Sequence, residues 1–237
     1  MSPNRDAIER EKKRIKDEYR RRETEVDADL YAPWQPAESF IVSERRSLAA
    51  LSLHKHGKFP AAGDQCLEIG YGKLGWLADL ISWGLRETDL HGIELDEKRA
   101  QIAQNALPNA DLRTGDATKL PWENDSFKII IASTVFSSIL DLNVRNGIAA
   151  EIERVLMPGG VLLWYDLARD NPRNPNVKSI KADELRQLFP RFAAQIEPVT
   201  LAPPIARFIV PKNRTLAVFL SSIPMLRTHL LGLLFKN

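Results

Sequence analysis

Short apolar runs alternate with helical patterns through the middle of the chain. Apolar runs bounded by turn residues predict strands, and apolar residues that recur every three or four positions predict helices between them. The expected strands cover 65–69, 89–94, 110–114, 127–133 and 160–165, and the expected helices cover 39–56, 74–83, 96–106 and 145–156. This alternation is typical of a parallel, doubly wound α/β sheet.

The pattern changes after Asp166. The remaining segments are a loop at 171–175, a helix at 182–189, a strand at 196–201, a helix at 215–222 and a last strand at 228–235. The two final strands lack a complete crossover, which predicts an antiparallel finish. We therefore expect a Rossmann-like, doubly wound, seven-stranded sheet that is mostly parallel, with an antiparallel pair at its C-terminal edge.

The N-terminal region has a different composition. Residues 4–23 carry alternating charges, with Ile8, Ile15 and Tyr19 near helical spacing, which predicts a largely solvated helix or arm. We expect residues 1–37 to form this arm and residues 38–237 to form one α/β domain.

Two prolines and three aromatic residues mark the end of the arm. Pro33 and Pro36 end any helix, and Tyr31, Trp34 and Phe40 lie around them. The segment is compatible with a packed connector, or with a lid that covers a pocket.

Composition narrows the class of protein. The 237 residues are 44% apolar, which suits one decorated domain, and 33 basic against 31 acidic residues do not indicate a nucleic-acid partner. Cys66 is the only cysteine, and the N-terminus lacks the apolar core of a signal peptide, so we expect a cytoplasmic protein. No membrane-spanning segment and no metal-ligand cluster is expected, and the sequence predicts no oligomeric state.

A glycine-rich turn follows the first expected strand. Gly70, Gly72 and Gly75 have the spacing Gly-x-Gly-x-x-Gly, which lets the backbone approach a nucleotide-like ligand closely. Glu94 follows at the distance of a ribose-binding acid. This motif alone is equally compatible with an NAD-dependent oxidoreductase.

Three further features distinguish the two kinds of nucleotide site. Glu68 stands where a dinucleotide fold normally has an apolar residue, and its carboxylate can order the turn or meet an amino group. Asp116 follows the third strand, where it can accept from an adenine amino group or cap its own turn. In 154–163 a proline and two glycines lie between a helix and a buried strand.

As a set, these motifs resemble those of the class I S-adenosylmethionine-dependent methyltransferases. The resemblance spans about residues 38–236 and is carried by Leu67–Gly72, Gly92–Glu94, Gly115–Ala117 and Val155–Gly160. The segments Thr134–Asp141, Leu163–Asp166 and Thr200–Arg207 are similar to a bacterial small-molecule branch, the type 11-like methyltransferases.

The resemblance implies S-adenosyl-L-methionine as cofactor and a set of residues around it. It places Gly70 and Gly72 at the methionine moiety, Glu94 at the ribose, Asp116 and Ala117 at the adenine, and Ser133 at the sulfonium, and Glu68 is counted among the cofactor-binding residues. It also implies a small-molecule acceptor, such as a sugar, glycolipid or secondary-metabolite hydroxyl.

For a hydroxyl acceptor a base would help, and Asp166 with the neighbouring Tyr165 is the best-placed pair. Asp166 is equally compatible with hydrogen bonding to the following loop. Lys73 and Leu74 depart from the family pattern, in which a small residue and a glycine are usual, and are expected to crowd the methionine end. A non-catalytic protein that binds S-adenosylmethionine is therefore an open alternative, beside the NAD-dependent oxidoreductase.

Overall fold

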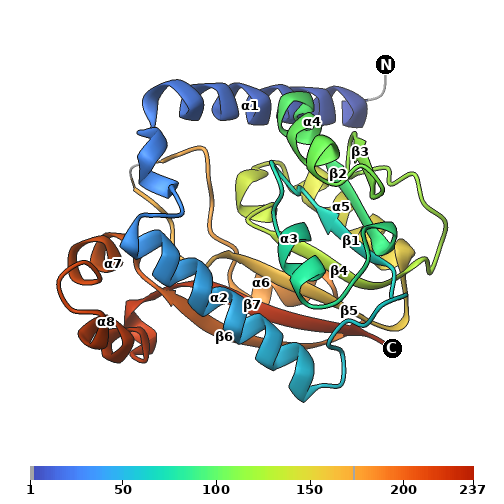
Figure 1. Ribbon diagram of the computed structural model, residues 1–237. Coiled ribbons are helices and arrows are strands. Elements are labelled where there is room, and N and C mark those ends of the chain that lie inside the picture. Colours follow the sequence, from blue (N-terminus) through green and yellow to red (C-terminus); the bar gives the residue numbers. More distant parts are fainter. Residues whose placement is uncertain (1–2, 173) are drawn as a thin grey trace.

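The computed structural model describes residues 3–172 and 174–237 and contains a seven-stranded sheet (Figure 1). The strand order is β3-β2-β1-β4-β5-β7-β6. The strands are β1 (Cys66–Ile69), β2 (Leu90–Glu94), β3 (Asp111–Thr114), β4 (Phe127–Ser133), β5 (Leu156–Leu167), β6 (Phe192–Leu201) and β7 (Arg227–Lys236). The first five strands are parallel, and β7 is antiparallel to both β5 and β6. The predicted fold class is confirmed.

The order of the strands reverses at β1, which pairs with β2 on one side and with β4 on the other. From β2 the chain continues outward to β3, and from β4 it continues outward to β5. The connections that leave the carboxyl edge of these two strands therefore run in opposite directions. Ligands of open α/β sheets bind at such a point. The glycine turn after Ile69 lies there.

Helices cover both faces of the sheet because side chains alternate along each buried strand. In β4, Ile129 and Ile131 pack with the helices α2 (Pro36–Lys55), α3 (Leu77–Ser82) and α4 (Glu97–Ala106). Ile130 and Ala132 face the opposite layer, with α5 (Leu142–Val155) and α6 (Ala182–Leu188). The core thus lies in two layers, one on each side of the sheet.

Two further helices project from one end of the molecule, between β6 and β7 (Figure 1). They are α7 (Pro203–Ile209) and α8 (Arg214–Ser221). A small cluster that includes Phe40, Ala206 and Ala217 attaches them to the start of α2. The sequence pattern predicted α8 but not α7, because α7 begins with two consecutive prolines, which also occur in loops.

The N-terminal helix α1 (Pro3–Glu25) lies across the molecule near α4 and α5 (Figure 1). The expectation of a largely solvated helix is wrong for one of its faces, since Glu11, Ile15 and Glu18 are buried. A short 3-10 turn, η1 (Ala28–Tyr31), leads from α1 towards α2. Beyond η1, Trp34 is 70% exposed, so its ring is not packed into the core.

Candidate active site

A cavity of about 700 Å³ lies at the carboxyl edge of the sheet, a volume within the range of ligand sites. Its walls come from α1, from the turns after β1 to β4, from the end of β5, and from the start of β7. Five of the predicted cofactor residues line it: Gly70, Glu94, Asp116, Ala117 and Ser133. Tyr165 lines it as well.

Gly70 brings the backbone close to the cavity. Its φ of +70° lies in the left-handed region that favours glycine, and a Cβ there would lie 2.9 Å from Val135 Cγ2. Its amide donates to the carbonyl of Ile93 (2.8 Å), which ties the turn to β2. Only glycine fits this position without displacing a neighbour.

Glu94 connects two turns through its buried carboxylate. Oε2 accepts from the amide of Gly72 (2.7 Å), and Oε1 accepts from the amide of Asp96 (2.9 Å). Each carboxylate oxygen can accept a second hydrogen bond. Glu94 also lines the cavity, so its acceptor capacity fits the two hydroxyls of a ribose. Gly72 supports Glu94 but does not itself line the cavity.

Glu68 acts from behind the turn. Both of its oxygens accept from the amide of Trp76, at 3.1 and 2.9 Å, just before α3 begins. Burial raises the pKa of Glu68 to about 8, although the bond from Trp76 opposes this shift. The carboxyl group therefore orders the glycine turn, one of the two roles considered from the sequence, and lies outside the lining.

Asp116 divides its carboxylate between its own turn and the cavity. Oδ1 accepts from both the amide and the hydroxyl of Thr118, each at 2.8 Å. Oδ2 lies 3.5 Å from Lys12 Nζ on α1. One oxygen thus caps the turn, while the other faces α1 at the wall of the cavity.

The opposite end of the cavity contains an aromatic stack. The rings of Tyr165 and His229 lie parallel, with centroids 4.9 Å apart, and the Tyr165 hydroxyl is hydrogen-bonded to Thr200 Oγ1 at 2.9 Å. The Arg45 guanidinium lies 5.2 Å from the Tyr165 ring centroid. Burial lowers the pKa of His229 to about 4 and raises that of Tyr165 to about 12. Both side chains are therefore neutral near pH 7.

Asp166 points away from this end, because adjacent residues of a strand face opposite sides. Its carboxylate accepts from the amides of Ser137 (2.9 Å) and Leu167 (2.8 Å) and is fully buried. Burial raises its pKa to about 6. Asp166 is absent from the cavity lining, whereas Tyr165 and Leu167 on either side of it belong to the lining.

Lys73 and Leu74 do not crowd the site. Lys73 is exposed, and Leu74 packs against the core layer that contains α3. Neither residue lines the cavity. The expected crowding of the methionine end by these two side chains is therefore wrong.

The helix α1 forms a wall of the cavity that the sequence did not reveal. Lys12, Ile15, Tyr19 and Arg22 line the cavity, and the Arg99 guanidinium from α4 lies 4.3 Å from the Tyr19 ring centroid. The spacing of Ile15 and Tyr19 was the available signal. The charges around them instead favoured a solvated helix.

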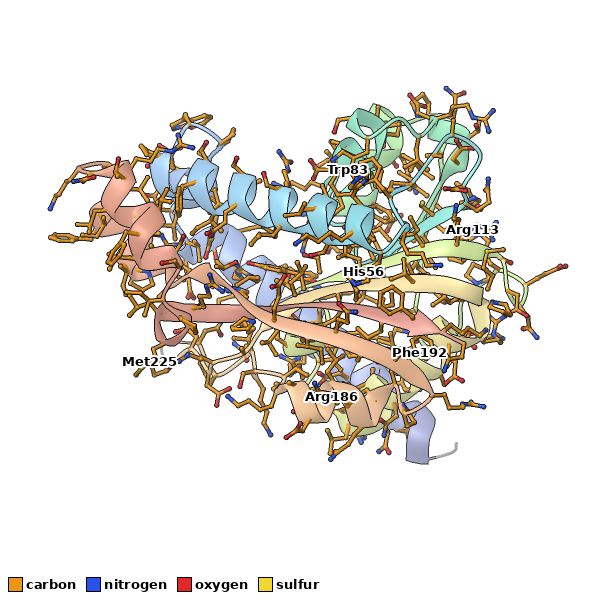
Figure 2. The ribbon with its side chains drawn as sticks, turned by 90° about the horizontal axis from the view of Figure 1, so that it is seen from below. His56, Trp83, Arg113, Arg186, Phe192 and Met225 are labelled. Atoms are coloured by element: carbon orange, nitrogen blue, oxygen red, sulfur yellow. The ribbon has the colours of Figure 1, made fainter. Side chains whose placement is uncertain are left out.

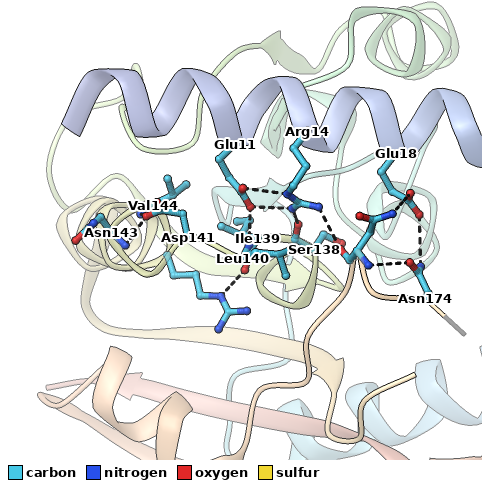
Figure 3. Close-up of polar contacts among 12 residues, drawn as sticks. Glu11, Arg14, Glu18, Ser138, Ile139, Leu140, Asp141, Asn143, Val144 and Asn174 are labelled. Atoms are coloured by element: carbon cyan, nitrogen blue, oxygen red, sulfur yellow. Dashed lines mark hydrogen bonds and ion pairs between the residues drawn. The ribbon is translucent and has the colours of Figure 1, made fainter. Parts of the chain in front are cut away.

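Two acidic residues fasten α1 to loops that are distant in sequence (Figure 3). Glu11 accepts from the amide of Leu140, and Arg14 donates to the carbonyl of Ser138. Glu18 accepts from the side-chain amides of Asn174 (3.4 Å) and Asn176 (2.7 Å). These contacts hold α1 against the loops beside the cavity.

Within the described residues, no group of three or more His, Cys, Asp or Glu side chains has an arrangement that could hold a metal ion. The same part of the chain contains no helix long and apolar enough to cross a membrane.

Comparison with known proteins matches residues 67–164 to a methyltransferase domain. The chain is 30% identical over 168 residues to the phthiotriol/phenolphthiotriol dimycocerosates methyltransferase of Mycobacterium tuberculosis, which covers 70% of this chain and 58% of that protein. It is 30% identical over 111 residues to the demethylmenaquinone methyltransferase of Chlorobaculum parvum, covering 47% of this chain and 44% of that protein. The chain spans about half the length of the curated relatives it matches.

The fold is shared with solved methyltransferase structures. A SAM-dependent methyltransferase from Archaeoglobus fulgidus matches with a TM-score of 0.57 at 14% identity, and the match covers 83% of this chain and 98% of that chain. At this identity the likeness shows the fold alone.

Proposed function

We propose that this chain, which belongs to the class I S-adenosylmethionine-dependent methyltransferases, transfers a methyl group to a hydroxyl of a small lipophilic acceptor. The observation that carries the proposal is the single cavity, which joins Gly70, Glu94 and Asp116 at one end to Tyr165 and His229 at the other. A donor and an acceptor held in one enclosed space meet the main requirement of the reaction, which is alignment.

The cofactor end fits S-adenosylmethionine in its donor and acceptor groups. Glu94 offers two buried carboxylate oxygens for the ribose hydroxyls, Asp116 offers Oδ2 for the adenine amino group, and Gly70 places the backbone at the wall of the cavity. When bound, S-adenosylmethionine supplies an activated methyl group on a sulfonium. Polar side chains placed in this way orient a ligand and set its specificity.

At the acceptor end, the residues differ in what they can do with a proton. His229 is neutral, and its Nδ1 lies 3.0 Å from Thr228 Oγ1. In the tautomer in which Nδ1 donates its proton to Thr228, Nε2 is free to accept the proton of an acceptor hydroxyl. Tyr165 retains its proton and can orient the acceptor oxygen. Asp166 supports the loop at Ser137 and acts only through Tyr165 and that loop.

The relatives support a lipophilic acceptor. Their names refer to phthiotriol, phenolphthiotriol dimycocerosates and demethylmenaquinone, which are small molecules of lipid character. The apolar lining of this cavity includes Ile15, Ile41 and Ile139 and is suited to such a molecule.

We further propose that residues 1–37 act as a lid, with α1 rather than the aromatic connector as its covering element. Ile15 and Tyr19 lie over the cofactor end, and the Tyr31 ring has Arg22 at 5.8 Å and Arg207 at 5.6 Å from its centroid. Exclusion of water from the reacting groups is the expected benefit.

The test is turnover with a panel of hydroxylated lipids. The readouts are the release of S-adenosylhomocysteine and the mass of a product in which one hydrogen is replaced by a methyl group. We expect activity in the wild type and a loss of about 100-fold or more in His229→Asn. Binding of S-adenosylmethionine without turnover on any acceptor would favour the non-catalytic alternative. Binding of NAD in its place would favour the oxidoreductase.

A further inference from the structure

Exposed apolar side chains are concentrated on the segment between β6 and β7. Of the ten large hydrophobic residues that are exposed in the described part of the chain, five lie between positions 203 and 226. These five are Phe208, Leu216, Val218, Phe219 and Met225, and we call them the α7–α8 patch. Phe208, Phe219 and Met225 are 63%, 64% and 79% exposed. Exposed apolar side chains concentrated in this way mark an interaction surface.

The charge of this segment has one sign. No Asp or Glu occurs from Pro198 to the C-terminus, whereas Arg207, Lys212 and Arg214 lie within or beside the α7–α8 patch. Lys212 Nζ lies 3.4 Å from the centroid of the Phe208 ring. The cations therefore share their surface with the apolar groups, and a partner of negative charge is indicated.

The patch projects away from the sheet and is not part of its core. Figures 1 and 2 show α7 and α8 together at one end of the molecule, with Met225 at its margin. Within α8, only Ala217 and Ser221 are buried, both of them small. Leu216 and Phe219, three positions apart, lie on one exposed side of the helix.

The same segment reaches the cavity. Pro203 and Pro204 at the start of α7 line it, together with Arg207 in its last turn, and the Arg207 guanidinium lies over the Tyr31 ring. A partner surface bound to the α7–α8 patch would therefore lie close to the acceptor end of the cavity.

We propose that the α7–α8 patch docks on the surface of a lipid bilayer that contains anionic phospholipid, and that the acceptor reaches the cavity from this bilayer. Apolar side chains that enter the interface, flanked by cations at the level of the headgroups, are the usual composition of such surfaces. The identity of the acceptor rests on the proposed function, but the docking itself does not. The proposed contact is peripheral, with the apolar side chains of the patch at the level of the interface.

The experiment is co-sedimentation of the full chain with vesicles of phosphatidylcholine, with and without phosphatidylglycerol. We expect binding that requires phosphatidylglycerol and weakens with salt. Lys212→Glu/Arg214→Glu should weaken it about 25-fold or more, because each cation near the surface contributes about fivefold. The matched control Lys98→Glu/Arg186→Glu, on exposed residues of α4 and α6, should bind as the wild type does.

A second pair of variants tests the apolar contribution. Phe208→Ser/Phe219→Ser should reduce binding about tenfold or more, whereas Ile102→Ser/Leu142→Ser, on exposed apolar residues of α4 and α5, should leave it unchanged. All four side chains are exposed, so melting temperatures should stay close to that of the wild type.

Equal binding to neutral vesicles, absence of binding, or equal losses in patch and control variants would overturn the proposal. So would a dimer that Phe208→Ser/Phe219→Ser converts to a monomer without any vesicle binding, because the patch would then face a second copy. Vesicle binding without methyl transfer would overturn the proposed function and leave the docking established. Methyl transfer to a lipophilic acceptor dispersed in detergent, without vesicle binding, would overturn the docking and leave the proposed function established.

Discussion

Replacing Glu94 with alanine separates its role in the fold from its role in the cofactor site. In the folded chain its two oxygens accept from the amides of Gly72 and Asp96, and the side chain is only 2% exposed. Glu94→Ala therefore leaves two buried amides without their acceptors. Each such loss costs about 1–3 kcal/mol, and water in the adjoining cavity can offset part of it.

The expected destabilisation is about 2–4 kcal/mol, out of about 5–15 kcal/mol for a typical domain. In a chain of this size it lowers the melting temperature by about 5–12 °C. The ribose also loses charge-assisted hydrogen bonds of about 1.5–3 kcal/mol each, so the dissociation constant for S-adenosylmethionine should rise at least about tenfold.

Calorimetric titration at a temperature well below the transition, beside a thermal scan, measures both effects. Glu97→Ala is the matched control, because Glu97 is an exposed carboxylate in the first turn of α4, the helix that follows Glu94. An unchanged dissociation constant in a destabilised Glu94→Ala variant would refute the ribose assignment. An unchanged melting temperature would refute the role of the carboxylate in holding the two turns.

Four further outcomes are expected. Burial lowers the pKa of His229 to about 4, so as the pH falls from about 6.5 to 4 the unfolded chain takes up a proton that the folded chain does not. The free energy of unfolding therefore decreases as the pH falls through this range. Urea unfolding of His229→Asn should show a smaller decrease. Burial raises the pKa of Glu68 to about 8, so the free energy of unfolding decreases as the pH rises from about 4.5 to 8. Glu68→Gln keeps an acceptor for the amide of Trp76, and at pH 8 it should be more stable than the wild type in the same urea unfolding. Glu11→Gln/Arg14→Gln should loosen α1 and raise the cofactor release rate several-fold in stopped-flow fluorescence, with a melting temperature lower by only about 2–4 °C. Methyl transfer should persist in excess EDTA, because displacement at a sulfonium needs no Lewis acid.

Local patterns in the sequence were enough for β4, at the centre of the sheet. β4 has the predicted bounds 127–133, because five of its seven residues are apolar and the strand ends at a turn. The edge strand β6 begins four residues earlier than the expected 196, at Phe192, and includes exposed Glu197 and Pro198. A half-exposed edge strand lacks the apolar run that identifies a central one.

For the candidate site, the sequence located the residues that follow strands. Glu94, Asp116 and Ser133 lie at the cavity because parallel strands end at one edge of a sheet. Arg45, Tyr19 and His229 come from helices and from the antiparallel strand β7, and their position depends on how these elements pack. The periodicity of the sequence assigns such a residue to a helix or a strand, but it does not show which other element that helix or strand packs against.

The helix α1 shows why its charges were misleading. Burial alone would raise the pKa of Glu11, but hydrogen bonds from Arg14 and from the amide of Leu140 more than offset it, so the pKa is lowered. The hydrogen bond from Arg21 lowers the pKa of Glu18 in the same direction. A carboxylate with a depressed pKa stabilises the folded state above its ordinary range, and this contribution is lost as the pH falls through the folded-state value. The ionised carboxylates that made α1 resemble a solvated helix therefore also fasten it over the cavity. Their partners outside α1, Leu140 for Glu11 and Asn176 for Glu18, lie 129 and 158 positions away in the sequence.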